Sequence, residues 1–177
     1  MTQAVKDRQN DIDAMVRVDH AGEFGATRIY AGQLAVMGDR APGSNEIAAM
    51  AAQEAEHRAR FDALLIERGV RPTILQPFWD VAGFALGAAT ALIGPEAAMA
   101  CTAAVETEID KHYSDQLDAL GEDDAELSQI IHKFRDEERE HHQTAIESGA
   151  ERAPAYALLS GAIRLGCKAA IAVSKRI

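Results

Sequence analysis

The sequence predicts an all-α protein in which four long helices form a bundle. Three observations predict this fold class. Alanine is frequent, β-branched runs are rare and only five prolines occur in 177 residues, a composition that favours helices over strands. Long segments carry apolar residues at intervals of three and four, as on the buried face of a helix. Short stretches with glycine or proline separate them. The length suits one domain with a sizeable core, so we assign residues 1–177 to a single domain.

The first half of the chain predicts a hairpin of two helices. Residues 1–10 are polar, and we expect them to be flexible. The first helix should run from about Asp11 to Met37 and the second from Ser44, as its cap, to about Arg68. Both apolar stripes are interrupted by polar residues. The stripe of the first contains Val16, Glu23, Tyr30 and Leu34, and that of the second contains Ile47, Met50, Glu54, His57, Phe61, Leu64 and Leu65.

Residues 70–95 predict a long crossover that contains an apolar helix. No charge occurs from Val81 to Ile93, but the run is shorter than the about 20 apolar residues that span a bilayer. Gly83 and Gly87 have the spacing that permits close contact between helices. Two interpretations remain open: a crossover helix packed in the core, or an apolar helix at a membrane surface or over an apolar ligand channel.

The second half predicts another hairpin and an extra helix. The third long helix should run from Pro95 to about Leu120, and the fourth over about 123–148. Their inner faces contain Met99, Ala103, Glu106, Ile109 or Asp110 and Tyr113 on the third, and Leu127, Ile131, Phe134, Glu138, His141 and Ala145 on the fourth. The last helix, 155–175, is amphipathic, with basic residues Arg164, Lys168, Lys175 and Arg176. It can pack on the bundle or lie on anionic lipid.

Charge and cysteine content exclude some classes of function. The formal net charge of −10 repels nucleic acid, so we expect no nucleic-acid partner. Cys101 and Cys167 are too far apart in the sequence to form a short metal-binding motif. We interpret both as small buried hydrophobic residues in a reducing compartment.

Two Glu-x-x-His pairs stand out from this background. They are Glu54 with His57 and Glu138 with His141. A spacing of three places the carboxylate and the imidazole on one face of a helix. Two such pairs, together with one glutamate from each of two other helices, form the ligand set of a carboxylate-bound di-iron bundle.

The two further glutamates occur at matching intervals. Glu23 precedes Glu54 by 31 residues, and Glu106 precedes Glu138 by 32. At about 1.5 Å per helical residue, Glu23 and Glu106 each lie about 22 Å from the following turn, so all four carboxylates can meet at mid-height. The crossover is long enough to start the second hairpin from the opposite end, as in ferritin-like folds.

The charges and donor types of this set predict the metal. Four carboxylates need about two divalent cations for neutrality. With two imidazoles, the donors suit iron or manganese, and two such metals can bind dioxygen or a substrate oxygen between them. The predicted ligands are Glu23, Glu54, His57, Glu106, Glu138 and His141.

Three other polar residues near the set each fit two interpretations. His112 fits either a place beside the site or the surface, and His20 either orients Glu23 or lies on the surface. Glu137 either accepts a hydrogen bond from an imidazole of the facing hairpin, as metal-bound histidines usually require, or is solvated.

Several longer motifs occur along the chain. They are Arg17–Ala26 (RVDHAGEFGA), Arg28–Gln33 (RIYAGQ), Gly83–Ala88 (GFALGA), Ala98–Thr102 (AMACT), Phe134–Glu138 with His141 and His142, and Ala153–Ala157 (APAYA). Together they resemble the demethoxyubiquinone hydroxylases of ubiquinone biosynthesis, and the resemblance covers about residues 13–177.

This resemblance implies a ferritin-like di-iron monooxygenase. Such an enzyme uses O2 to hydroxylate the ring of 2-polyprenyl-3-methyl-6-methoxy-1,4-benzoquinone. The family's ligands fall on the same six residues, and His112 and Tyr113 match positions next to the site that are candidates for a catalytic role. No Gly-x-Gly-x-x-Gly motif follows a predicted strand. The resemblance therefore implies an external reductant, either a separate reductase or NADH.

The resemblance also implies a location and partners. A polyprenyl quinone lives in the membrane, so we expect a peripheral protein at the cytoplasmic face of a bacterial cell membrane. Candidate partners are other ubiquinone-biosynthesis proteins and further copies of this chain. The alternatives are a ferritin-like iron-binding or peroxide-detoxifying protein and, less in keeping with the spacing, a metal-free helical interaction protein.

Overall fold

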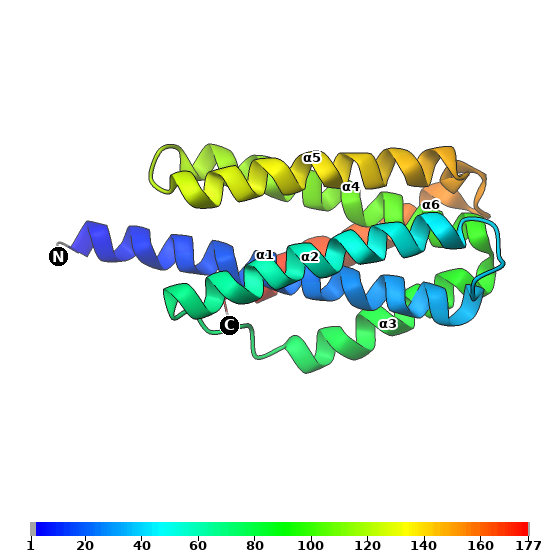
Figure 1. Cartoon of the computed structure of the whole chain (residues 1–177), viewed down its shortest axis with the longest axis horizontal. Helices are drawn as coiled ribbons and strands as arrows, with labels where there is room; N and C mark the ends of the chain where they lie inside the picture. Colours follow the sequence, from blue (N-terminus) through cyan, green and yellow to red (C-terminus); the bar gives the residue numbers. More distant parts are fainter. Residues whose placement is uncertain (1–2, 177) are drawn as a thin grey trace.

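The computed structural model describes residues 3–176, which are almost entirely helical and contain no strand (Figure 1). The predicted all-α class is confirmed. The helices are α1 (Gln3–Met37), α2 (Ser44–Arg68), α3 (Gln76–Ile93), α4 (Pro95–Leu120), α5 (Ala125–Glu147) and α6 (Tyr156–Ser174), with a 3-10 turn at Ala150–Arg152.

Two antiparallel hairpins, α1–α2 and α4–α5, form the bundle, and α3 connects them (Figure 1). Helix α3 runs beside the second half of α1, so α4 starts at the end of the bundle where α1 finishes. The predicted crossover to the opposite end is therefore confirmed. As a result, α1 and α4, the first helices of the two hairpins, run antiparallel to each other.

Helix α1 begins earlier than the sequence predicts. Residues 3–10 are helical rather than irregular, whereas residues 1 and 2 lie outside the described residues. Arg8 explains the extension: its guanidinium donates to the carbonyls of Ala119 and Leu120 at 2.6 and 3.0 Å and pairs with Asp123. These partners lie at the turn between α4 and α5, so the local sequence around Arg8 could not reveal them.

Two other helix starts also differ from expectation. Helix α3 begins at Gln76, with Pro77 in its first turn, rather than near Val81. Ser44 begins α2 but does not cap it through its side chain; Gly43, with a left-handed φ of 82°, precedes the helix instead. The Ser44 Oγ atom is buried and has no hydrogen-bond partner among residues 3–176.

The core contains three apolar clusters, and a polar layer separates two of them inside the bundle. All the inward residues predicted for α2 and α5 are buried. On α2, Met50 belongs to one cluster and Phe61 to the other. On α5, Ala145 and Phe134 belong to these same two clusters. The polar residues of both helices therefore lie at mid-height, between two apolar regions that exclude water.

Helix α3 packs closely on α1 through glycines. A Cβ at Gly87 would lie 1.9 Å from the carbonyl oxygen of Ile29, and one at Gly32 would lie 2.1 Å from that of Phe84. The expected close contact is thus present. The opposite face of α3 is nevertheless exposed and apolar, with Phe78, Val81, Leu92 and Ile93 in contact with solvent. Neither interpretation of the crossover is sufficient alone, because one face is packed and the other is open.

Helix α6 lies along α4 and exposes apolar residues as well. Arg164 Nε donates to Oε1 of the buried Glu108 at 2.6 Å, which fixes α6 on α4. Leu158, Leu165 and Val173 are exposed. Among the described helices, α6 alone has the length and apolar composition that a membrane span requires. Of the two free cysteines, Cys101 is buried as predicted, and Cys167 is only half-buried.

The close approach of α3 to α1 predicts that a methyl group added at Gly87 destabilises the fold. Gly87→Ala should lower the free energy of unfolding by about 1–3 kcal/mol, because the added Cβ collides with backbone. Gly161→Ala in α6 is the matched control, since its Cβ would have nothing within 4 Å, and it should be neutral or stabilising by up to about 1 kcal/mol. Urea unfolding measures both. A Gly87→Ala variant as stable as the parent would show that the two helices are farther apart.

Candidate metal centre

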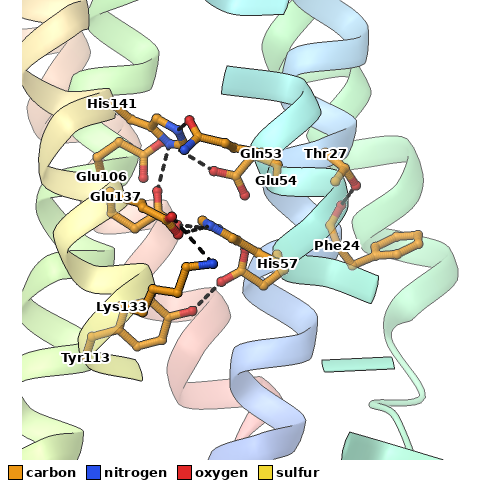
Figure 2. A network of polar contacts seen from close by, with 12 residues as sticks. Phe24, Thr27, Gln53, Glu54, His57, Glu106, Tyr113, Lys133, Glu137 and His141 are labelled. Atoms are coloured by element: carbon orange, nitrogen blue, oxygen red, sulfur yellow. Dashed lines mark hydrogen bonds and ion pairs between the residues drawn. The ribbon is translucent and has the colours of Figure 1, made fainter. Parts of the chain in front are cut away.

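Six buried side chains from four helices meet inside the bundle, and Figure 2 shows four of them, Glu54, His57, Glu106 and His141, pointing toward one another. Each is at most 2% exposed. They are Glu23 from α1, Glu54 and His57 from α2, Glu106 from α4, and Glu138 and His141 from α5. These are the six residues that the Glu-x-x-His pairs and the matching intervals selected.

Their donor atoms form two groups that could each hold a metal ion. One contains Glu23, Glu54, His57 and Glu138, and the other contains Glu54, Glu106, Glu138 and His141. Within each group the donor atoms lie within 4.8 Å of one another. Glu54 and Glu138 belong to both groups. Two adjacent positions that share two carboxylates are compatible with a dinuclear site.

Several carboxylate oxygens in this centre have no donor. Among residues 3–176, Glu23 Oε2, both oxygens of Glu54 and Glu106 Oε2 are buried without a hydrogen-bond partner. Burial, followed by the charge of Glu138, raises the pKa of Glu54 and of Glu106 well above the usual range. A buried oxygen without a donor is costly unless a cation or a proton compensates it. The unpaired oxygens of Glu23, Glu54 and Glu106 therefore have the chemistry and the burial that a bound metal cation would compensate.

The two imidazoles are oriented by partners outside the centre. His57 Nδ1 lies 3.1 Å from Glu138 Oε1, and its Nε2 donates to Glu137 Oε2 at 2.8 Å. His141 Nδ1 lies 3.0 Å from Glu138 Oε2, and its Nε2 donates to Gln53 Oε1 at 3.0 Å. Each ring thus turns Nδ1 toward the carboxylates and holds Nε2–H outside, as in a metal-binding histidine. The predicted hydrogen bond to Glu137 is confirmed (Figure 2).

The hydrogen bonds shift the pKa values of these groups in opposite directions. Burial alone would raise the pKa of Glu138, but hydrogen bonds from His141 and His57 lower it to about 2. Burial alone would lower the pKa of His57, but its hydrogen bond to Glu138 and the nearby carboxylate of Glu23, whose Oε2 lies 3.5 Å from His57 Nδ1, raise it to about 10. Without metal, the centre therefore holds imidazolium beside carboxylate, with protons on part of the remaining carboxyl groups.

Two tyrosines hold the outer carboxylates. The hydroxyl of Tyr113 donates to Glu23 Oε1, and that of Tyr30 donates to Glu106 Oε1 at 2.9 Å. Burial raises the pKa of both phenols well above the usual value, so they remain protonated donors. In Glu23 and Glu106 one oxygen is thus held while the other, Oε2, stays free.

Of three further predicted residues, Tyr113, His112 and His20, only Tyr113 contacts the centre. Tyr113 touches it, as expected, but His112 is hydrogen-bonded to Asp19, with its Nε2 3.0 Å from Asp19 Oδ1. His20 is buried, and in the described part of the chain its hydrogen bond is to Asp62 at 2.8 Å rather than to Glu23. Both alternatives given for His20, a contact with Glu23 and a place on the surface, are therefore wrong.

Sequence reasoning missed two contacts that a symmetry in the chain could have indicated. Tyr30 follows Glu23 by seven residues, as Tyr113 follows Glu106, and each tyrosine binds the glutamate of the other helix. Gln53 was also missed. It directly precedes a glutamate of the centre, as Glu137 does on α5, and both accept a hydrogen bond from the opposite imidazole.

An apolar cavity of about 480 Å³ adjoins the centre. It lies between α1, α3, α4 and α6 and is lined mainly by small and aliphatic side chains. Gly22 and Val105 line it, and each directly precedes a residue of the centre, Glu23 and Glu106. The centre and the cavity therefore lie on two sides of one wall formed by α1 and α4.

The fold and the site together define a ferritin-like helical bundle with a buried glutamate and histidine cluster compatible with metal. Comparison with known sequences specifies the family. Residues 10–174 match the family described as ubiquinone biosynthesis protein COQ7, and the chain belongs to that family.

Named relatives span bacteria and mitochondria. The chain is 55% identical over 169 residues to the mitochondrial NADPH-dependent 3-demethoxyubiquinone 3-hydroxylase of Rattus norvegicus, covering 93% of this chain and 77% of the relative. It is 55% identical over 166 residues to the 3-demethoxyubiquinol 3-hydroxylase of Rhodospirillum rubrum, with 94% and 78% covered. The mitochondrial 5-demethoxyubiquinone hydroxylase of Saccharomyces cerevisiae is 41% identical over 182 residues, with 94% and 78% covered.

The raised carboxyl pKa values predict how the metal-free protein responds to pH. A carboxyl group with a higher pKa in the folded state keeps its proton where the unfolded chain has lost it. The free energy of unfolding should therefore fall as the pH rises above 4.5, through Glu54 and Glu106. His57 adds to the decline, because its stabilisation is complete below pH 6.5 and lost as the pH rises through about 10.

Urea unfolding between pH 5 and pH 9 measures this dependence. The stabilisation from Glu138 is lost only as the pH falls from 4.5 through about 2, outside this range. Bound divalent metal should replace the protons, raise stability and flatten the profile. Metal-free protein that became more stable with rising pH would contradict the described electrostatics.

Proposed function

We propose that this chain is an O2-dependent monooxygenase of ubiquinone biosynthesis. Its substrate is the ring of 2-polyprenyl-3-methyl-6-methoxy-1,4-benzoquinone, and residues 1–177 act as one ferritin-like di-iron domain. The observation that carries the proposal is the pair of buried donor groups that share Glu54 and Glu138 in a chain of the COQ7 family. The names of the relatives support the reaction.

Two iron ions fit the donor set best. Glu23 and His57 would hold one ion, Glu106 and His141 would hold the other, and Glu54 and Glu138 would bind both. Mixed carboxylate and imidazole donors suit iron, and four carboxylates balance two divalent charges. When bound, the irons would supply the electrons for reduction of dioxygen.

The residues of the chain keep this centre oriented and dry. The Nε2–H groups of His57 and His141 are held by Glu137 and Gln53, so each Nδ1 faces the carboxylates and could bind metal once its proton is released. Phe134 stacks on the His57 ring with a centroid distance of 3.9 Å and separates it from water. His112, together with Asp19, lies outside the centre, so we assign the closer role to Tyr113.

The apolar cavity is the proposed site for the substrate. Its lining offers aliphatic contacts to an isoprenoid tail and a quinone ring. On both α1 and α4 a cavity residue directly precedes a residue of the centre, so a ring in the cavity is separated from the irons by one wall. A ferritin-like iron-binding or peroxide-detoxifying protein would need no such cavity, and this favours the hydroxylase.

Electrons must come from outside the chain. The name of the rat relative states NADPH dependence, and we propose a reduced nicotinamide, NADH or NADPH, as the external reductant. Other ubiquinone-biosynthesis proteins and further copies of this chain are the proposed partners.

The proposed location is the cytoplasmic face of a bacterial cell membrane, as a peripheral protein. The support comes from α3 and α6, which flank the cavity and expose apolar residues. Basic residues accompany them: Arg164 and Lys168 on α6, both paired with Glu108, and Lys175 and Arg176 directly after the helix ends at Ser174. Such a surface suits anionic lipid and would let a polyprenyl tail pass from the bilayer into the cavity.

The ligand assignment predicts loss of iron and activity in single variants. Glu138→Ala and His141→Ala should each reduce iron to well below two per chain and abolish hydroxylation, with helix content unchanged. His142→Ala, which changes the half-buried neighbouring histidine, is the matched control and should retain both. Metal analysis, circular dichroism and mass spectrometry of the quinone pool in complemented cells measure the outcome. Full iron and full hydroxylation in either ligand variant would refute the assignment.

The membrane proposal predicts binding to anionic vesicles. Leu92→Glu in α3 and Leu165→Glu in α6 should each weaken binding roughly tenfold, because burying a leucine contributes about 1.5–3 kcal/mol. Ile66→Glu changes an equally exposed apolar residue on α2 and should leave binding unchanged. Co-flotation with vesicles of mixed neutral and anionic lipid measures this. Equal losses in all three variants would argue against a specific surface.

A further inference from the structure

Glycines in α1 occur for two different reasons. Gly32 is required by packing, since a Cβ there would collide with the backbone of α3. Gly22 and Gly25 lie inside the same helix, yet a Cβ at either would meet no atom of residues 3–176 within 4 Å. Glycine is less favourable than alanine within a helix. Neither helix packing nor backbone conformation therefore explains these two residues.

The free space beside both glycines is the apolar cavity. Gly22 and Gly25 both line it, and Glu23 of the metal centre lies between them in the sequence. Val105 of α4 lines the same cavity next to Glu106. The missing side chains thus widen the cavity where its wall is shared with the metal centre.

An aromatic side chain also lines the cavity. Trp79 of α3 is among its lining residues. A planar ring can stack on an indole in an otherwise apolar space. A ligand with a ring therefore matches the cavity better than a purely aliphatic one.

We propose that Gly22 and Gly25 are specificity-determining residues, which keep the cavity wide enough for a methyl- and methoxy-substituted quinone ring beside the centre. This inference rests on the function proposed above. In an apolar pocket a single methylene changes discrimination by roughly 10- to 200-fold. One methyl group at either position should therefore exclude the substituted ring while stabilising the helix.

The single tryptophan of the chain provides a direct reporter. Trp79 lines the cavity, so a bound quinone should quench its fluorescence. The titration uses the full-length, iron-loaded protein and a demethoxyubiquinone analogue with one isoprene unit. Gly22→Ala and Gly25→Ala should each raise the Kd and KM roughly tenfold, leave the iron content unchanged and raise the Tm by roughly 2–4 °C. Gly161→Ala, whose Cβ is equally free but is not among the lining residues of this cavity, should raise the Tm alone.

Each outcome distinguishes this inference from the proposed function. Parent protein that binds and hydroxylates the analogue, with alanine variants within twofold of its Kd and KM, would overturn the inference alone. Variants that lose both stability and binding would also overturn it, because they would indicate a packing role. Parent protein that neither shows quenching nor hydroxylates the analogue would refute the proposed function, and this inference with it.

Discussion

Repulsion among four buried carboxylates is the constraint on which the rest of this structure depends. Water cannot reach them, and Glu54 has no hydrogen bond to either oxygen from residues 3–176. Two imidazoles compensate only part of the charge, and they do so mainly at Glu138. Only protons or cations can supply the remainder. The apolar clusters above and below the centre keep it dry, so a metal bound there would add to the stability of the fold.

The crossover helix links this centre to the second functional feature. By running along α1, α3 brings the second hairpin to the opposite end, so that the four glutamates meet at one height. The glycine contacts at Gly32 and Gly87 hold α3 close. With α6 it encloses an apolar cavity on the outer side of α1 and α4. The carboxylate centre and the apolar cavity thus share a wall formed by α1 and α4. This arrangement suits the oxidation of an apolar, lipid-like molecule.

The sequence alone predicted most of the bundle. Helix periodicity and glycine breaks located α2 and α4 at their observed bounds, and the inner faces of α2 and α5 were predicted residue by residue. Four of the six residues of the centre were found because a three-residue spacing on a helix has a fixed geometric meaning, and the matching intervals between glutamates located Glu23 and Glu106. Features that depend on distant partners were not predictable. Arg8 extends α1 through contacts at the α4–α5 turn, and His20 pairs with Asp62 of α2. The cavity needs the positions of four helices at once.

Part of what was missed was nevertheless encoded in the internal symmetry of the chain. In each half of the chain a tyrosine follows the first glutamate of the centre by seven residues: Tyr30 follows Glu23, and Tyr113 follows Glu106. In each half the second glutamate also follows directly after a residue that accepts a hydrogen bond from an imidazole, Gln53 or Glu137. Comparing the halves position by position would have indicated Tyr30 and Gln53. The cross-pairing between halves could not be derived from either half alone, because it requires the antiparallel arrangement that the crossover creates.

The central claim is that the shared carboxylates hold two irons. Anomalous scattering at the iron edge from crystals of anaerobically iron-loaded protein tests it most directly. The account predicts two peaks per chain inside the bundle, both adjacent to Glu54 and Glu138. A single internal peak, or peaks only on the acidic surface, would contradict it.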